Sequence, residues 1–194
     1  MNGYTIINIL DMIDAIGENE VNRILSDFSC PINNEIENFA KKNAVDFAKR
    51  KMSVTHLVLN EDGDLMAIFT LTHKALELGD KNLSAETRKK IKRYAQLNET
   101  TNSYMVSAFL IAQFGKNYAN GNNLQVDGDS LMESSMNVLK AVQREVGGGI
   151  VYLECENKPK LLSFYQNPRN IFRMFGERYS DIDNTKYIQL LRFF

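Results

Sequence analysis

Tyr104-Met-Val-Ser-Ala-Phe-Leu-Ile-Ala-Gln113 is a mostly apolar run of strand-forming residues that sets the architecture of this chain. A polar loop follows it, Lys116–Gly128, and then a helix that extends to about Val146. Three glycines at 147–149 stop the helix, and the apolar run Ile150–Cys155 forms a second strand. This order predicts a parallel βαβ crossover, and the loop of such a unit is where a ligand binds.

The helix of the crossover has both a start signal and a buried face. Ser130-Leu-Met-Glu133 matches a capping box, which places the helix start there. Apolar residues recur at spacings of three and four: Met132, Met136, Leu139, Val142 and Val146. After the second strand, Pro159–Tyr165 predicts a short closing helix.

Length and composition indicate a soluble globular protein with one domain, residues 1–194. The chain is 44% hydrophobic and 24% charged, which is typical of that class. A net charge of -1 gives no global electrostatic case for binding nucleic acid or an anionic membrane.

Cysteine usage and hydropathy predict the compartment. Two cysteines, Cys30 and Cys155, make no disulfide framework, and we expect both to be buried free thiols. The first residues lack a signal-peptide pattern, and no apolar run reaches the ~20 residues that span a bilayer. We therefore expect a cytoplasmic protein that does not associate with membranes.

The other stretches predict elements in a simple order. Residues 1–27 have helical spacing, with Gly17 between two short helices, and Asn33 suits the N-cap of a helix to about Lys51. The strand-like stretches are Val54–Leu59 with Leu65–Leu78, an antiparallel hairpin, and Asn170–Tyr179 with Thr185–Phe194, joined by residues 180–184. The prediction is an α/β (α+β) domain with a mixed, mostly antiparallel central sheet and helices on both faces.

Residues 79–102 form a polar insertion between strands. Ser84 suits the cap of a short helix that carries the strongest basic run in the chain: Arg88, Lys89, Lys90, Lys92 and Arg93. Such a run is either a solvent-facing helix or a contact surface for a nucleic acid or an acidic partner. The two histidines, His56 and His73, have no second ligand at close spacing, so we expect no metal site.

Several motifs in this order resemble the Gcn5-related N-acetyltransferases. They are Phe28-Ser-Cys30 before a helix, the Thr55–Leu71 hairpin, and Leu161-Leu-Ser-Phe164-Tyr165 on the closing helix. The resemblance extends from about Phe28 onward and is closest to the bacterial branch that includes toxin-like acetyltransferases. It implies acetyl-CoA as co-substrate and an amine-bearing acceptor, which is a small molecule, a protein or an aminoacyl-tRNA.

The resemblance also implies where acetyl-CoA binds. Backbone groups of Phe109, Leu110 and Ile111 would pair with the pantetheine arm, and one amide there would polarise the thioester carbonyl. The pyrophosphate would lie on the loop and the helix start: Asn123, Gln125, Val126, Gly128, Asp129 and Ser130. The sequence departs from the family here, because only Gly128 matches fully and Asp127 and Asp129 add negative charge.

By the same resemblance, Tyr165 is the general acid that protonates the departing thiolate. The alternative is a core aromatic residue beside Phe164. Glu154 is the candidate base that takes a proton from the ammonium of the acceptor, and the alternative is a surface glutamate. Cys155 has no group nearby in sequence that would lower its pKa, so we exclude it as a nucleophile.

Three hypotheses about function follow. The first is acetyl transfer from acetyl-CoA to a primary amine by direct attack in a ternary complex. The second is a toxin-type enzyme that acetylates aminoacyl-tRNA and contacts RNA through Arg88–Arg93. The third is a non-catalytic binding module, suggested by the glycine-poor loop. An exposed Leu190–Phe194 edge predicts a homodimer contact.

Overall fold

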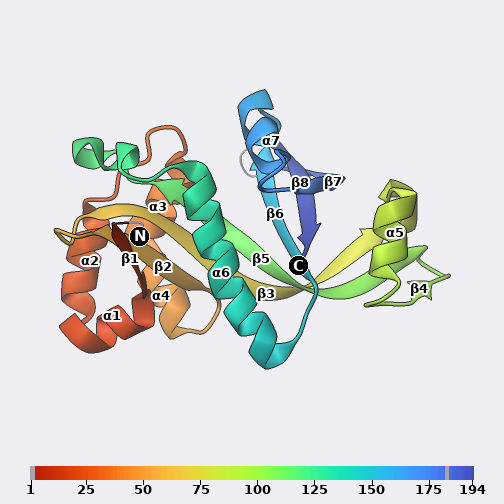
Figure 1. Ribbon diagram of the computed structural model, residues 1–194, viewed down its shortest axis with the longest axis horizontal. Helices are drawn as coiled ribbons and strands as arrows, with labels where there is room; N and C mark the ends of the chain where they lie inside the picture. Colours follow the sequence, from red (N-terminus) through yellow and green to blue (C-terminus); the bar gives the residue numbers. More distant parts are fainter. Residues whose placement is uncertain (1–2, 182–183) are drawn as a thin grey trace. The chain divides into compact units, whose positions relative to one another are not determined.

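The structure is a computed structural model that describes residues 3–181 and 184–194 (Figure 1). Its strands hydrogen-bond in the order β1-β2-β3-β5-β6-β8-β7, and β4 pairs with β5. The strands are β1 (Tyr4–Asn8), β2 (Val54–Asn60), β3 (Leu65–Gly79), β4 (Leu97–Asn98), β5 (Ser103–Lys116), β6 (Ile150–Glu156), β7 (Arg173–Ser180) and β8 (Thr185–Phe193). The sheet is mixed, because β5 and β6 are parallel whereas β1–β2, β2–β3, β4–β5, β6–β8 and β7–β8 are antiparallel.

The helices agree with most of the sequence predictions. They are α1 (Ile9–Ile16), α2 (Glu18–Ser26), α3 (Asn34–Lys42), α4 (Ala44–Lys49), α5 (Ala85–Ile91), α6 (Gly128–Val146) and α7 (Pro159–Tyr165), with 3-10 turns η1 (Asp80–Asn82) and η2 (Ala119–Leu124). The parallel β5–β6 pair joined through α6 confirms the predicted crossover. None of the described helices is long and apolar enough to cross a membrane.

Contacts divide the chain into two compact units. The first unit comprises the described residues up to Thr72 together with Ile111–Met136. The second unit comprises His73–Leu110 and Asn137–Phe194. The prediction of a single domain stays a prediction, and each unit is described by itself below.

In the first unit, helices cover both faces of β1, β2 and β3. The pairs Ile7↔Leu57 and Leu57↔Ile68 place these side chains on the face that packs against α1–α4. Tyr4 points to the other face, because it lies an odd number of residues from Ile7. There its hydroxyl lies 3.0 Å from the Ser134 hydroxyl of α6.

Two predictions in this unit were wrong in detail. The first residues are not all helical, since β1 pairs with the edge of β2 and Asn8 then caps α1 by accepting from the Leu10 amide at 2.9 Å. The helix predicted from Asn33 to about Lys51 is two helices, because Asn43 leaves the helical conformation (φ -120°) between α3 and α4. The Asn33 cap itself is confirmed.

In the second unit, β8 lies between β6 and β7. Leu190 and Leu191 are fully buried, so the prediction of an exposed edge at Leu190–Phe194 was wrong. The apolar residues near the end of the chain suggest a free edge, but β8 is hydrogen-bonded on both sides, to β6 and to β7. The homodimer loses this support and stays a prediction. Residues 182–183, within the predicted β7–β8 connection, lie outside the described residues.

The insertion is part of the core of the second unit. Ser84 caps α5 as predicted, accepting from the Thr87 amide at 3.1 Å. Leu83 and Ile91 are buried in a cluster with Tyr104 of β5 and Leu191 of β8. One side of α5 is therefore fixed by packing, and its other side carries the charges.

Candidate functional site

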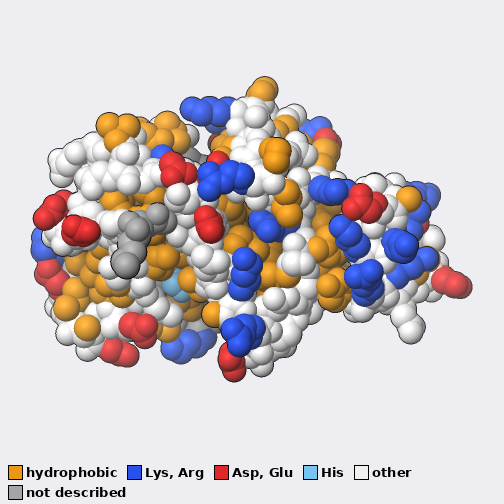
Figure 2. Space-filling model, in the orientation of Figure 1, with side chains coloured by type: hydrophobic (Ala, Val, Ile, Leu, Met, Phe, Trp, Pro, Cys, Tyr) orange, Lys and Arg blue, Asp and Glu red, His pale blue; other side chains and the backbone are white. Residues whose placement is uncertain are grey.

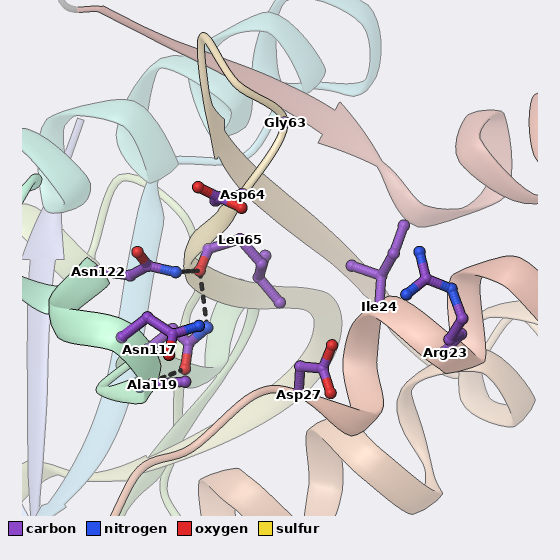
Figure 3. A pocket seen from close by; sticks show the side chains of 10 residues that line it. Arg23, Ile24, Asp27, Gly63, Asp64, Leu65, Asn117, Ala119 and Asn122 are labelled. Atoms are coloured by element: carbon purple, nitrogen blue, oxygen red, sulfur yellow. Dashed lines mark hydrogen bonds between the residues drawn. The ribbon is translucent and has the colours of Figure 1, made fainter.

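The loop after β5 is held by side-chain amides instead of glycines. Asn117 and Asn122 both donate to the Leu65 carbonyl, at 2.7 and 3.1 Å (Figure 3). The loop turns through Asn120 and Gly121, whose φ angles are 53° and 76°. Asparagine tolerates this left-handed region better than most residues. The loop is thus built rigidly from short polar side chains.

The start of α6 differs from the predicted capping box. Asp127, which lies three residues before the predicted cap Ser130, accepts from the Ser130 amide at 2.9 Å and from its hydroxyl at 2.5 Å. The Leu131 amide donates to the Asp127 carbonyl at 3.1 Å, which closes the first turn. The prediction that Ser130 is the N-cap was therefore wrong, because the helix begins at Gly128 and Asp127 accepts from an amide of its first turn.

The predicted pyrophosphate residues all lie in the first unit, and several are already engaged. The Gln125 amide donates to Asn122 and accepts from Asn60 at 2.9 Å. Val126 is buried, so its side chain packs inward. Lys116 donates to the Asn123 carbonyl at 3.1 Å and has no carboxylate partner among the described residues. Lys116 thus places a cation beside the loop.

A pyrophosphate fits this helix start only in part. Gly128 is the first residue of α6, and the amides of a first helical turn lack intrahelical acceptors, which favours an anion. The Asp127 carboxylate, however, already occupies the Ser130 amide and opposes a second anion. The Lys116 ammonium, which donates to the Asn123 carbonyl of this loop, is a cation that can offset that repulsion.

A polar pocket of about 160 Å³ lies in the first unit beside the same loop (Figure 3). It is lined by Arg23 of α2, Asp27 at the C-cap of α2, Asp64 of the β2–β3 turn and Asn122. Pockets that enclose an organic ligand usually measure about 300–1,000 Å³. This pocket is therefore too small to be the site of a whole acetyl-CoA molecule.

Of the three predicted β5 residues, Phe109 and Ile111 are buried and Leu110 is half-buried. Phe109 and Leu110 pair with Val151 and Tyr152 of β6, in the second unit. The Phe109 ring packs against His73 at 5.3 Å and against Gly148, where a Cβ would come within 2.9 Å of the ring. Ile111 is buried in the first unit. With their side chains committed to packing, these residues can offer a ligand only backbone groups, as the resemblance implies.

Tyr165 ends α7 and is 7% exposed. Its ring packs against Phe164 at 4.9 Å and edge-on against Phe172 at 5.9 Å. Burial raises the pKa of Tyr165, and the nearby Cys155 adds to the effect. A tyrosine of ordinary pKa is already protonated at neutral pH, and the raised pKa makes this phenol a weaker proton donor, so burial does not favour Tyr165 as an acid.

Glu154 lies in the second unit with both oxygens engaged. Arg178 approaches one oxygen at 2.7 Å, and Gln189 donates to the other at 2.8 Å. A base must present a lone pair to the proton that it takes. The pairing therefore favours a structural role for this carboxylate over the predicted role as a base.

The cysteines and His56 are core residues. Burial raises the pKa of Cys155 to about 11, which disfavours a thiolate nucleophile. His56 stacks on Phe69 at 4.9 Å, and burial lowers its pKa to about 4. Among the described residues, no group of three potential ligands is placed to hold a metal ion.

The basic run on α5 and in the two residues after it separates into paired and unpaired cations. Arg88 forms an ion pair with Asp80 at 2.7 Å, and Lys90 pairs with Glu86 at 3.0 Å. Lys89, Lys92 and Arg93 are exposed and have no acidic partner among the described residues. Figure 2 shows Lys and Arg side chains gathered where Figure 1 draws α5. Three cations there are available to a partner.

No protein-family model matches the chain, and no curated protein matches it by sequence. Solved structures do match over nearly its whole length. AtaT complexed with acetyl-methionyl-tRNAfMet has a TM-score of 0.66 at 15% identity, covering 98% of this chain and 94% of that one. The chain has the acetyltransferase fold.

Two further structures support that assignment. A tyrosine-to-phenylalanine mutant of the toxin AtaT, bound to the C-terminus of the antitoxin AtaR and acetyl-CoA, has a TM-score of 0.59 at 13% identity, covering 98% of this chain and 93% of that one. A tyrosine-to-phenylalanine mutant of KacT has a TM-score of 0.65 at 16% identity, covering 95% and 94%. The resemblance to toxin-like acetyltransferases is thus confirmed at the level of the fold.

Proposed function

We propose that this protein is an N-acetyltransferase that moves the acetyl group of acetyl-CoA to a primary amine. One observation carries the proposal: the fold matches, over 98% of the chain, a structure that contains an acetylated aminoacyl-tRNA. A related structure contains acetyl-CoA itself. The parallel β5–β6 pair, the loop and α6 supply the parts that the resemblance assigns to acetyl-CoA.

The residues take the following roles in this proposal. Backbone groups of Phe109, Leu110 and Ile111 bind the pantetheine arm, and one of their amides stabilises the oxyanion. The start of α6, from Gly128, binds the pyrophosphate with help from Lys116. These roles rest on the backbone geometry of β5 and on the helix start, because the side chains there are buried or engaged.

The chemistry is a direct transfer. The neutral amine attacks the thioester carbon, and the carbonyl oxygen becomes the oxyanion. Collapse of this intermediate breaks the carbon–sulfur bond, and the thiolate takes the proton of the Tyr165 hydroxyl. The new ammonium loses its proton to solvent or to a base. The assignment of this step to Tyr165 rests on the resemblance, which implies an acid at the Phe-Tyr pair of the closing helix.

The decisive experiment measures acetyl-CoA binding by calorimetry and then release of CoA thiol with methionyl-tRNA, spermidine and a lysine-bearing peptide as acceptors. Tyr165→Phe should lower kcat about 10²–10⁴-fold, as expected for loss of a general acid. The matched control is Tyr179→Phe, at a tyrosine that is 57% exposed, which should leave kcat unchanged. If no acyl-CoA binds, the non-catalytic binding module becomes the better hypothesis.

We propose aminoacyl-tRNA as the acceptor because α5 presents unpaired cations and because a neighbour was solved with acetyl-methionyl-tRNAfMet. Lys89, Lys92 and Arg93 would contact phosphates. Arg88 is a poor choice for a charge-reversal test, because it also donates to the Asp80 and Leu83 carbonyls. Affinity for tRNA that does not change with salt would exclude this acceptor.

The proposed setting is the bacterial cytoplasm. A further structure of this fold is described as a bacterial toxin, with a TM-score of 0.56 at 15% identity. Cys30 and Cys155 are buried free thiols, which suits a reducing compartment. Cross-linking and sedimentation would test the homodimer.

A further inference from the structure

The turn after α7, residues 167–172, contains a conformational outlier. Ile171 has φ 52° although it is β-branched. Side chains branched at Cβ clash with the backbone in this region, so such a residue there is rare and strained. Backbone strain of this kind persists only where the surrounding structure enforces it, and it concentrates at functional sites.

Hydrogen bonds attach this turn to the end of α7. The Phe172 amide donates to the Tyr165 carbonyl at 3.0 Å, and the Ile171 amide donates to the Asn167 carbonyl at 2.9 Å. The Asn170 side chain, almost fully buried, donates to the Phe164 carbonyl at 2.9 Å. The turn is therefore hydrogen-bonded directly to Tyr165, the proposed acid.

Arg192 of β8 is a charged group that reaches this turn. Its Nη1 donates to the Asn170 carbonyl at 3.0 Å, and its guanidinium lies 5.7 Å from the centre of the Phe172 ring. Arg192 has no carboxylate partner among the described residues, and its Nε is buried without an acceptor there. Burial lowers its pKa. A half-buried cation without a counter-ion is costly, so its presence needs an explanation.

We infer that Arg192 is a positioning residue for Tyr165. Arg192 holds the Asn170 carbonyl and the face of the Phe172 ring, and the edge contact between Phe172 and Tyr165, at 5.9 Å and 77°, fixes the phenol. A proton donor must lie within hydrogen-bond reach of the leaving atom, and a displacement of about 1 Å can cost about 100-fold in rate. This inference rests on the proposed function, because it requires Tyr165 to be the acid.

The test is a double-mutant cycle on kcat, with acetyl-CoA and the best of the three acceptors named above. Arg192→Met keeps the apolar stem but removes the donor and the charge. It should lower kcat about 10- to 100-fold and leave the KM for acetyl-CoA unchanged. In a Tyr165→Phe background, Arg192→Met should lower kcat no further, because the group that it positions is gone.

The outcomes separate the two claims. If Tyr165→Phe alone leaves kcat unchanged, the proposed acid is wrong and this inference fails with it. If Tyr165→Phe lowers kcat but the two effects multiply, the acid stands and only the positioning role is overturned. Arg192→Lys, which retains a cation and a donor, should recover part of kcat.

Controls for folding come from the same unit. Arg144→Met changes an exposed arginine on α6 and should leave kcat unchanged. Thermal unfolding of each variant identifies any that fail to fold. Should Arg192→Met be one of these, Phe172→Leu interrupts the same link while keeping apolar volume, and it should show the same loss of additivity with Tyr165→Phe. Full additivity would overturn the inference.

Discussion

Asp127 offers a sharp test of where the pyrophosphate binds. Its carboxylate lies 2.9 Å from the Ser130 amide, over the first turn of α6. Asn caps helices about as well as Asp, so Asp127→Asn removes the charge and keeps the cap. We expect its free energy of unfolding to stay within about 0.5 kcal/mol of wild type.

The gain in acetyl-CoA affinity follows from Coulomb's law. Two unit charges about 4 Å apart in water repel by about 1 kcal/mol, and a pyrophosphate diester carries two negative charges. Removing the Asp127 charge should therefore strengthen binding by about 1–2 kcal/mol, or about five- to thirtyfold in Kd. Calorimetry at low salt measures this change, which should shrink at high salt.

Asp127→Ala is the matched variant, since it removes both charge and cap. It should lower the free energy of unfolding by about 1 kcal/mol, which Asp127→Asn does not. Unchanged or weaker acetyl-CoA binding by Asp127→Asn would refute the reasoning, because a pyrophosphate on this helix start must sense the carboxylate.

Three other perturbations have defined outcomes. Lys51 is exposed, follows α4 and has a φ of 59°. Lys51→Gly should raise the free energy of unfolding, measured with urea, by about 0.5–1 kcal/mol, because relief of left-handed strain exceeds the entropy cost of glycine. Burial lowers the pKa of His56 from its ordinary value of 6.5 to about 4, so the folded state binds fewer protons than the unfolded state. The stability that depends on neutral His56 is present above pH 6.5 and is lost as the pH falls towards 4. The loss should be about 2.5 kcal/mol by pH 4.5, and His56→Leu should flatten that part of the stability curve. Replacing Lys89, Lys92 and Arg93 with Gln should reduce the slope of log K against log salt for tRNA by about 2 to 3, and an unaltered slope would remove α5 from the RNA interface.

The sequence predicts the fold where local signals agree with tertiary packing. The crossover strands, the end of α6 at Val146 and the limits of α7 follow from apolar spacing, glycines and Pro159. Strand β1 escapes such reasoning because a five-residue run next to helical spacing is stabilised by pairing with β2, which is distant in sequence.

The candidate site is less accessible from sequence, because its contacts are long-range. Asp127 and Ser130 are both suitable cap residues, and only the structure shows that the helix begins early and that Asp127 accepts from the Ser130 amide. Glu154 looks like a free carboxylate until β7 and β8 bring Arg178 and Gln189 to it. Arg192 gives no sequence signal at all, since Asn170 and Phe172 are about twenty residues away along the chain.

The position of β8 has a consequence for synthesis on the ribosome. Thr185–Phe193 follows both β6 and β7 in the sequence yet lies between them in the sheet. Neither of those strands can pair with β8 until this segment has left the ribosome, so their apolar side chains stay exposed during translation. Long-range strand pairing of this kind is slow and exposes nascent chains to aggregation. We therefore expect the second unit to form late, and prematurely terminated chains that lack β8 to be substrates for chaperones and proteases.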